Sequence, residues 1–249
     1  MITPIPMRVA VITPYYREPL EVLWICHESV LKQTYRCTHF MVADGYPQTE
    51  VSTWNIEHIQ LSASHCDVGN TPRGIGSMSA MNLGYDAICF LDADNWYYPN
   101  HVETMVSLHQ HTGAAVCTTS RMMHRLDGSF MYVDRTDCDG KNHVDTSCFF
   151  VTSSAFRVLP IWMMMPPQLG PIGDRIFWRA VVSRGISCAH NMDPTVAFRT
   201  QYDMHYTGIG ETPPPKAKSY EETVGKALNW MNSLPENTRN ELMRHLESG

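Results

Sequence analysis

The 249-residue sequence contains no apolar run long enough to cross a membrane, no cluster of basic residues and no closely spaced pair of cysteines. Because a membrane-spanning helix needs about 20 consecutive apolar residues, the sequence predicts no transmembrane segment. Nucleic-acid-binding proteins gather Lys and Arg to neutralise phosphates. This chain instead has a formal net charge of -6, so we expect no nucleic-acid partner. The N-terminus lacks the basic and apolar regions of a signal peptide, which favours a cytoplasmic location.

The eight cysteines are scattered along the chain and lack the short paired spacings that are typical of zinc sites. We therefore expect reduced thiols rather than disulfides or a structural zinc ion. Hydrophobic residues make up 43% of the chain and charged residues 18%. A chain of this size and composition can bury a full hydrophobic core, and it needs no covalent cross-links to fold.

Apolar runs alternate with helical patterns in the first half of the chain. Strands are predicted at residues 8–13, 39–43, 54–61, 87–91 and 114–119, and helices at 21–32, 77–84 and 101–111. Such alternation indicates a mainly parallel sheet that is covered by helices on both faces. Ligands of these sheets bind beyond the carboxyl ends of the strands. Thr13, Asp44 and Asp92 stand at such ends.

The second half is less regular. Strands are predicted at residues 130–133, 143–151 and 195–199, and helices at 153–159 and 174–184. Residues 207–218 contain two glycines and three consecutive prolines, which predict a loop. Ser219 and Glu222 have capping-box spacing, so a helix is predicted from there to Trp230, followed by another at 236–246.

The most informative segment is the apolar run 88–91, which leads directly into Asp92-Ala93-Asp94. Hard divalent cations prefer oxygen ligands, and a diphosphate leaving group needs its charge neutralised. Two carboxylates at the end of a strand suit both needs. Because Asp-x-Asp also occurs in solvated turns, the segment needs support from other motifs.

Four other motifs supply that support: VITPYYR at 11–17, VADG at 42–45, GNTPR at 69–73 followed by NLG at 82–84, and GDR at 173–175 with WR behind it. In this order, the segments resemble motifs of the GT-A glycosyltransferases, especially those of the inverting family 2. The resemblance spans about residues 9–199. Two positions differ, because the family commonly has Glu-Asp where this chain has Gly173-Asp174, and an Asn where this chain has Gly74.

The resemblance implies an α/β fold of the GT-A type. In this fold a Rossmann-like, mainly parallel sheet is flanked by helices, with a smaller acceptor-side region and C-terminal helices. The GT-A domain would span residues 1–218, with residues 1–119 binding the nucleotide-sugar and 120–218 forming the acceptor side and a lid. Residues 219–249 would form a helical tail.

The activity implied by the resemblance is the transfer of a sugar from a nucleoside-diphosphate sugar, above all a UDP-sugar, to an acceptor hydroxyl such as that of a glycan. Inversion at the anomeric carbon and a divalent cofactor, Mn²⁺ or Mg²⁺, are implied as well.

At the nucleoside, the resemblance implies contacts from Thr13, Pro14 and Tyr15, with the Tyr15 ring stacked on the base. Asp44 would accept a hydrogen bond from the imide N–H of the base, which favours uracil. From the residues alone, Tyr15 could equally be a packed loop aromatic. Asp44 could likewise be a turn former beside Gly45.

At the diphosphate, the resemblance implies that Asp92, Ala93 and Asp94 contact the donor, with Asp92 holding the ribose or a metal-bound water. Asp94 would bind the metal, assisted by Asp92. Arg73 would pair with these acids or with the diphosphate. Its alternative role is a surface ion pair, which contributes little to stability.

Asp174 would be the general base that removes the proton of the acceptor hydroxyl. As the first acid of a helix it could also serve as a helix cap. His205 is the candidate for completing the metal shell, and His190 is its competitor. Residues 207–215 would form the lid that closes over the donor.

Three other functions stay open. A sugar-phosphate nucleotidyltransferase would carry a Gly-rich basic loop where this chain has Thr13-Pro14-Tyr15-Tyr16, which disfavours that reading. A retaining GT-A transferase shares the metal motif. A nucleotide-sugar-binding module without turnover would tolerate the loss of Asp94 or Asp174, and both are present.

Overall fold

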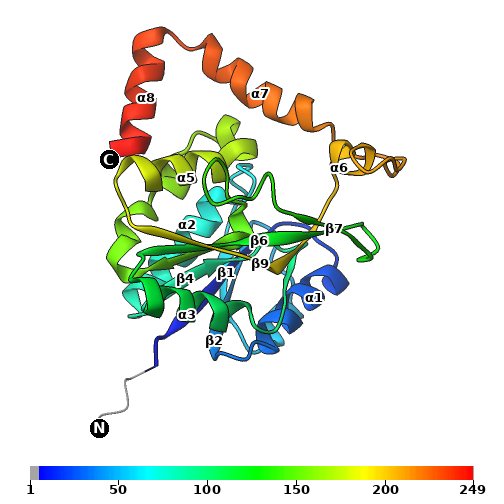
Figure 1. The fold of residues 1–249 in the computed structure, drawn as a ribbon, viewed down its shortest axis with the longest axis vertical. Coiled ribbons are helices and arrows are strands. Elements are labelled where there is room, and N and C mark those ends of the chain that lie inside the picture. The colour runs from blue at the N-terminus through cyan, green and yellow to red at the C-terminus, as the bar shows by residue number, and fades with distance from the viewer. Residues whose placement is uncertain (1–5, 249) are drawn as a thin grey trace.

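The computed structural model describes residues 6–248, which form a nine-stranded mixed sheet flanked by helices (Figure 1). The strand order is β3-β2-β1-β4-β8-β6-β9-β5, with β7 paired to β6. The strands are β1 (Val9–Tyr15), β2 (Cys37–Asp44), β3 (Glu57–Leu61), β4 (Ala87–Phe90), β5 (Trp96–Tyr97), β6 (Val116–His124), β7 (Phe130–Asp134), β8 (Phe149–Thr152) and β9 (Cys188–Arg199). This is the expected mainly parallel α/β architecture of the GT-A type.

Helices cover both faces of the sheet. The α-helices are α1 (Leu20–Leu31), α2 (Asn70–Asn82), α3 (His101–Thr112), α4 (Ile161–Met164), α5 (Gly173–Ser183), α6 (Asp203–Thr207), α7 (Tyr220–Ser233) and α8 (Glu236–Ser248). In Figure 1, α2 and α5 lie on one side of the sheet, and α1 and α3 lie on the other. This double cover explains why all residues of β1 and β4 are buried, and why both appear in the sequence as continuous apolar runs.

The parallel half of the sheet consists of β3, β2, β1 and β4. Since these strands run the same way, their carboxyl ends meet at one edge, where Asp44 ends β2 and Asp92 follows β4. The other half is mixed: β8 is antiparallel to both β4 and β6, whereas β9 is parallel to β6.

Helix α2 begins at Asn70, seven residues before the predicted start at 77. The sequence conceals this start because Pro72, Gly74 and Gly76 are typical of loops. Pro72 lies in the first turn, where its missing N–H costs nothing. Gly76 lies so close to β1 that a Cβ there would be 2.6 Å from the Ile12 methyl carbon Cγ2. This glycine therefore permits close helix–strand packing.

Two predicted elements in the second half differ from the structure. Residues 143–151 were expected as one strand, but only Phe149–Thr152 is a strand, preceded by a short 3₁₀ helix, Thr146–Cys148. Asp145 caps that helix by accepting a hydrogen bond from the Ser147 N–H. The helix expected at 153–159 is a 3₁₀ helix, Ser153–Val158.

After α6, the chain forms the Gly/Pro loop and comes back beside residues 201–202. It then continues into α7 and α8 (Figure 1). The Lys218 N–H donates to the Gln201 carbonyl oxygen at 2.7 Å, and Tyr202 and Lys218 form a parallel bridge. Ser219 caps α7 by accepting from the Glu222 N–H, as its spacing predicted. Within residues 6–248, no helix is both long and apolar enough to span a membrane.

Candidate functional site

A pocket of about 460 Å³ lies at the carboxyl ends of the parallel strands. Its walls come from the end of β2, the loops after β1, β3, β4 and β7, the starts of α2 and α5, the end of β9 and the segment that leads from there into α7. The predicted site residues that line it are Pro14, Tyr15, Asp44, Arg73, Asp92, Ala93, Asp94, Asp174 and His205. Thr13 and the alternative metal ligand His190 do not belong to this lining.

Arg73 lines the pocket and is fixed from several sides. One terminal nitrogen donates to Asp92 Oδ1 at 2.7 Å, and the other donates to Asn70 Oδ1 at 2.9 Å. The guanidinium carbon lies 4.7 Å from the centre of the Trp162 ring. The expected pairing of Arg73 with the acids of the motif is thus present. Its side chain is only 4% exposed, so this is no surface ion pair.

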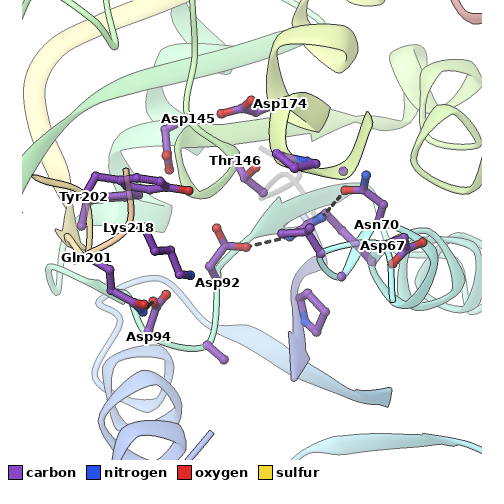
Figure 2. A pocket seen from close by; sticks show the side chains of 18 of the residues that line it. Asp67, Asn70, Asp92, Asp94, Asp145, Thr146, Asp174, Gln201, Tyr202 and Lys218 are labelled. Carbon is purple, nitrogen blue, oxygen red and sulfur yellow. Dashed lines mark hydrogen bonds and ion pairs between the residues drawn. The ribbon is translucent and has the colours of Figure 1, made fainter. Parts of the chain in front are cut away.

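Asp94 lies in a more negative environment than Asp92. Burial raises the pKa of the Asp94 carboxyl to about 7, and the negative charges of Asp92 and Glu18 add to this effect. Gln201 Nε2 donates to Asp94 Oδ2 at 3.2 Å. Figure 2 shows the Lys218 side chain extending toward the space beside the two carboxylates. Its positive charge acts in the opposite direction on the Asp94 pKa.

A divalent cation suits this chemistry, because Asp92 and Asp94 offer hard oxygen ligands and a cation would favour the ionised form of Asp94, whose pKa is raised by burial. The described residues contain no group of three or more His, Cys, Asp or Glu side chains arranged to hold a metal. His205 is 9% exposed, and its Nδ1 lies 2.6 Å from Thr200 Oγ1. Burial lowers the pKa of His205 to about 4, so the ring is neutral at pH 7.

In the loop after β1, the two tyrosines that follow Pro14 differ in exposure. Tyr15 is 2% exposed, and its hydroxyl lies 2.8 Å from His58 Nε2. Tyr16 is 37% exposed and also lines the pocket. Thr13 is buried behind them, with its Oγ1 2.8 Å from His39 Nε2. The stacking role of Tyr15 stays a prediction, and Tyr16 presents the more accessible ring.

Asp44 is tied to the loop that follows β3. It accepts hydrogen bonds from the Ser64 hydroxyl at 3.0 Å and from the His65 N–H at 3.1 Å. The His65 ring Nδ1 lies 2.7 Å from the same carboxylate. Three groups therefore already contact the carboxylate, which leaves about one of its roughly four acceptor sites for another hydrogen bond. The proposed contact with the base stays a prediction.

Asp174 lies in the first turn of α5 but does not cap the helix. Its Oδ1 accepts from the Arg175 N–H, and its Oδ2 lies 2.8 Å from His143 Nε2. Burial alone would raise the pKa of the Asp174 carboxyl, but the charge and hydrogen bond of His143 outweigh burial and lower it. At the neighbouring Gly173, a Cβ would lie 2.9 Å from Asn70 Nδ2. A Glu here, which is usual in family 2, would require the Asn70 amide to move.

Several residues that line the pocket are not predicted by any sequence pattern, notably His143, Gln201, Tyr202 and Lys218. His143 falls in a segment that was read as a strand. The other three flank the Gly/Pro loop, and no motif marks them. The sequence marks only the segment between them, because its glycines and prolines, such as Gly208 and Pro213, predict a loop.

The chain was compared with known families and structures. The model of the family "Glycosyl transferase family 2" matches residues 10–153. No curated protein sequence matches the chain. The crystal structure of residues 1–349 of S. aureus TarS with UDP has a TM-score of 0.60 at 12% identity, over 96% of this chain and 70% of that one. The corresponding UDP-GlcNAc complex has a TM-score of 0.60 at 12% identity, over 96% and 71%. A longer TarS structure has a TM-score of 0.58 at 14% identity, over 93% and 45%.

Proposed function

Because the chain belongs to glycosyl transferase family 2 and is a glycosyltransferase, we propose that it transfers a sugar from a UDP-sugar to an acceptor hydroxyl with inversion. One observation carries this proposal. The Arg73–Asp92 pair, Asp94 and Asp174 line a single pocket at the carboxyl ends of the parallel strands. A group for the leaving diphosphate and a group for the acceptor proton therefore share one cavity.

The preference for UDP has two supports. The similar TarS structures were solved with UDP and with UDP-GlcNAc. In this chain, a carboxylate at the end of β2, Asp44, lines the pocket as an acceptor for an imide N–H. The exposed ring of Tyr16 offers a surface on which the base can stack.

The proposed cofactor is Mn²⁺ or Mg²⁺, held by Asp94 and Asp92, with His205 as the remaining protein candidate. Such an ion would neutralise the negative charge of the departing diphosphate. Lys218 adds a fixed positive charge on the same side of the pocket. Arg73 keeps the Asp92 carboxylate in place for these contacts.

Asp174 acts in this proposal as the general base. Its lowered pKa keeps the carboxylate ionised at neutral pH. A weak base still accepts the proton when transfer is late, because the attacking hydroxyl becomes acidic as its bond to the anomeric carbon forms. Tyr202 and Tyr220 line the pocket on this side, and their rings suit the apolar face of a sugar acceptor.

A thermal-shift screen with nucleotide-sugars, with and without Mn²⁺, tests the donor and the metal together. We expect UDP-sugars to raise the melting temperature in the presence of Mn²⁺ and to lose this effect in EDTA. Stabilisation by a GDP- or TDP-sugar alone would contradict the UDP assignment. The anomeric configuration of the product, determined by NMR, then separates inversion from the retaining alternative.

A further inference from the structure

The carboxylate of Asp174 is held by a histidine that connects it to a second carboxylate. His143 Nε2 lies 2.8 Å from Asp174 Oδ2, and His143 Nδ1 lies 3.3 Å from Asp137 Oδ2. The His143 side chain is only 7% exposed, whereas that of Asp137 is 44% exposed. All three side chains line the pocket.

Asp137 is itself anchored by a buried arginine. Arg121 donates to Asp137 Oδ2 at 2.8 Å, to Asp134 Oδ2 at 2.9 Å and to Asp145 Oδ2 at 2.6 Å. This network fixes the loop 135–145 against β6. The loop therefore presents His143 to α5 from a rigid support, not from a free surface segment.

The charges around His143 favour its protonated form. Burial by itself lowers the pKa of His143, but Asp174 and Asp137 together raise it to about 10. The charged or titratable groups that face Asp174 and His143 from all neighbouring elements are Asp137, Asp145, Arg121, Arg175, Tyr202 and Tyr220. The imidazolium thus sits between two carboxylates.

We propose that His143 is a positioning residue that aims the Asp174 carboxylate at the acceptor hydroxyl and keeps it ionised, with Asp137 holding the imidazolium at its other ring nitrogen. This inference rests on the proposed function, because it takes Asp174 as the base. With Oδ1 held by the Arg175 N–H and Oδ2 by His143, the carboxylate cannot rotate about its terminal bond. In the reaction, the hydroxyl proton moves to Asp174 as oxygen bonds to the anomeric carbon and the diphosphate leaves. Asp174 then releases the proton to water, and His143 keeps both of its protons.

An ion pair that merely ties the loop to α5 is the competing explanation, and the pH dependence of turnover separates the two. In His143→Gln, the amide can still donate to Asp174 but carries no charge. The pKa of the buried Asp174 then rises, so the acid limb of kcat/KM should move to higher pH by about 1–3 units. We expect the affinity for UDP with Mn²⁺, measured by calorimetry, to stay within about twofold of the wild type.

His190→Gln is the matched control. His190 packs against the same loop, since a Cβ at Gly140 would lie 2.4 Å from its ring, and it bonds to Thr118 and Ser120 rather than to Asp174. This variant should leave the acid limb in place. An unmoved limb in His143→Gln, or an equal shift in His190→Gln, would overturn the positioning role.

NMR of the His143 ring gives a readout that needs no turnover. We expect the ring to stay protonated through pH 8 in the wild type and to titrate at lower pH in Asp174→Asn. A ring that titrates near its ordinary value in the wild type would overturn the inference. The proposed function fails separately: in that case, wild-type protein would turn over no nucleotide-sugar, or Asp174→Asn would be fully active.

Discussion

Arg73 donates a hydrogen bond to Asp92 across 2.7 Å, and this contact joins the first turn of α2 to the end of β4. It also makes the two acids of the motif unequal. The charge of Asp92 is paired with a buried guanidinium, whereas Asp94 has the Gln201 amide, and its pKa is raised to about 7. Asp94 is therefore the acid without an arginine partner, and a bound cation would favour its ionised form.

The first prediction concerns that acid. Asp94→Ala should weaken UDP binding in Mn²⁺ by more than tenfold, which corresponds to about 1.4 kcal/mol, because the cation loses its main protein ligand. Calorimetry with and without EDTA measures this. Asp127→Ala, at an acid in the turn between β6 and β7, is the control and should bind normally. Undiminished affinity in Asp94→Ala would remove the metal assignment.

The second prediction concerns recognition of the nucleobase by Asp44. Asp44→Ala should weaken UDP by about 1.5–3 kcal/mol, the range for a hydrogen bond to a charged group, and should weaken pyrophosphate much less. Because Asp44 also holds Ser64, Ser64→Ala serves as a control that disturbs the loop but keeps the carboxylate. Equal weakening of both ligands by Asp44→Ala would mean that Asp44 only supports the loop.

The central strands β1 and β4 could be predicted from the sequence because they are buried on both faces. The run 88–91 is apolar throughout, and its end marks the pocket edge without any tertiary information. Helix α2 was found only in part, because Gly76 serves a contact with Ile12 that lies far away in the sequence. Local propensity cannot reveal a contact of this kind.

The parts of the pocket around Asp174 and Lys218 could not be predicted from the sequence, because contacts between distant residues form them. His143 reaches Asp174 through a loop that Arg121 anchors, and nothing near His143 in the sequence shows this. Lys218 reaches the pocket because its backbone pairs with Gln201 across the Gly/Pro loop. The sequence shows only that a loop lies between them.

The third prediction concerns that loop. No residue of 207–215 lines the pocket, although both stems of the loop do. Glu211 ties the loop to the end of β6 by accepting a hydrogen bond from Arg125 Nε at 2.9 Å. If the loop closes as a lid, its amides should exchange more slowly once UDP-sugar and Mn²⁺ are bound. In the Glu211→Gln variant, the amides of this loop should exchange faster than in the wild type when no donor is bound. Unchanged exchange on saturation with donor would exclude the lid.

The fourth prediction concerns acid stability. Burial lowers the pKa of His101 to about 3, and its Nδ1 lies 2.8 Å from Thr195 Oγ1. Because the folded-state pKa lies below the unfolded value of about 6.5, the stability from the neutral ring is complete above pH 6.5 and is lost as the pH falls toward 3. Between pH 7 and pH 5, His101 should account for a loss of about 2 kcal/mol.

Urea unfolding of the wild type and of His101→Asn at both pH values measures this contribution. Asn can replace the hydrogen bond of Nδ1 but does not titrate. The variant should be less stable at pH 7, since it loses the stacking of His101 on Tyr97, yet it should lose less stability on acidification. An equal loss in both proteins would show that His101 does not cause the acid sensitivity.

The last prediction is that Asp174→Asn lowers turnover by about 10²–10⁴-fold, the usual contribution of a general base. Asparagine keeps the size of the side chain, its carbonyl oxygen can still accept from the Arg175 N–H, and its NH₂ group can donate to Nε2 of a neutral His143, so folding and donor affinity should stay nearly unchanged. Single-turnover kinetics at saturating donor isolates the chemical step, and the melting temperature checks the fold. Near-native turnover in this variant, or a product that retains the anomeric configuration of the donor, would instead favour a retaining mechanism in which Asp174 has a structural role.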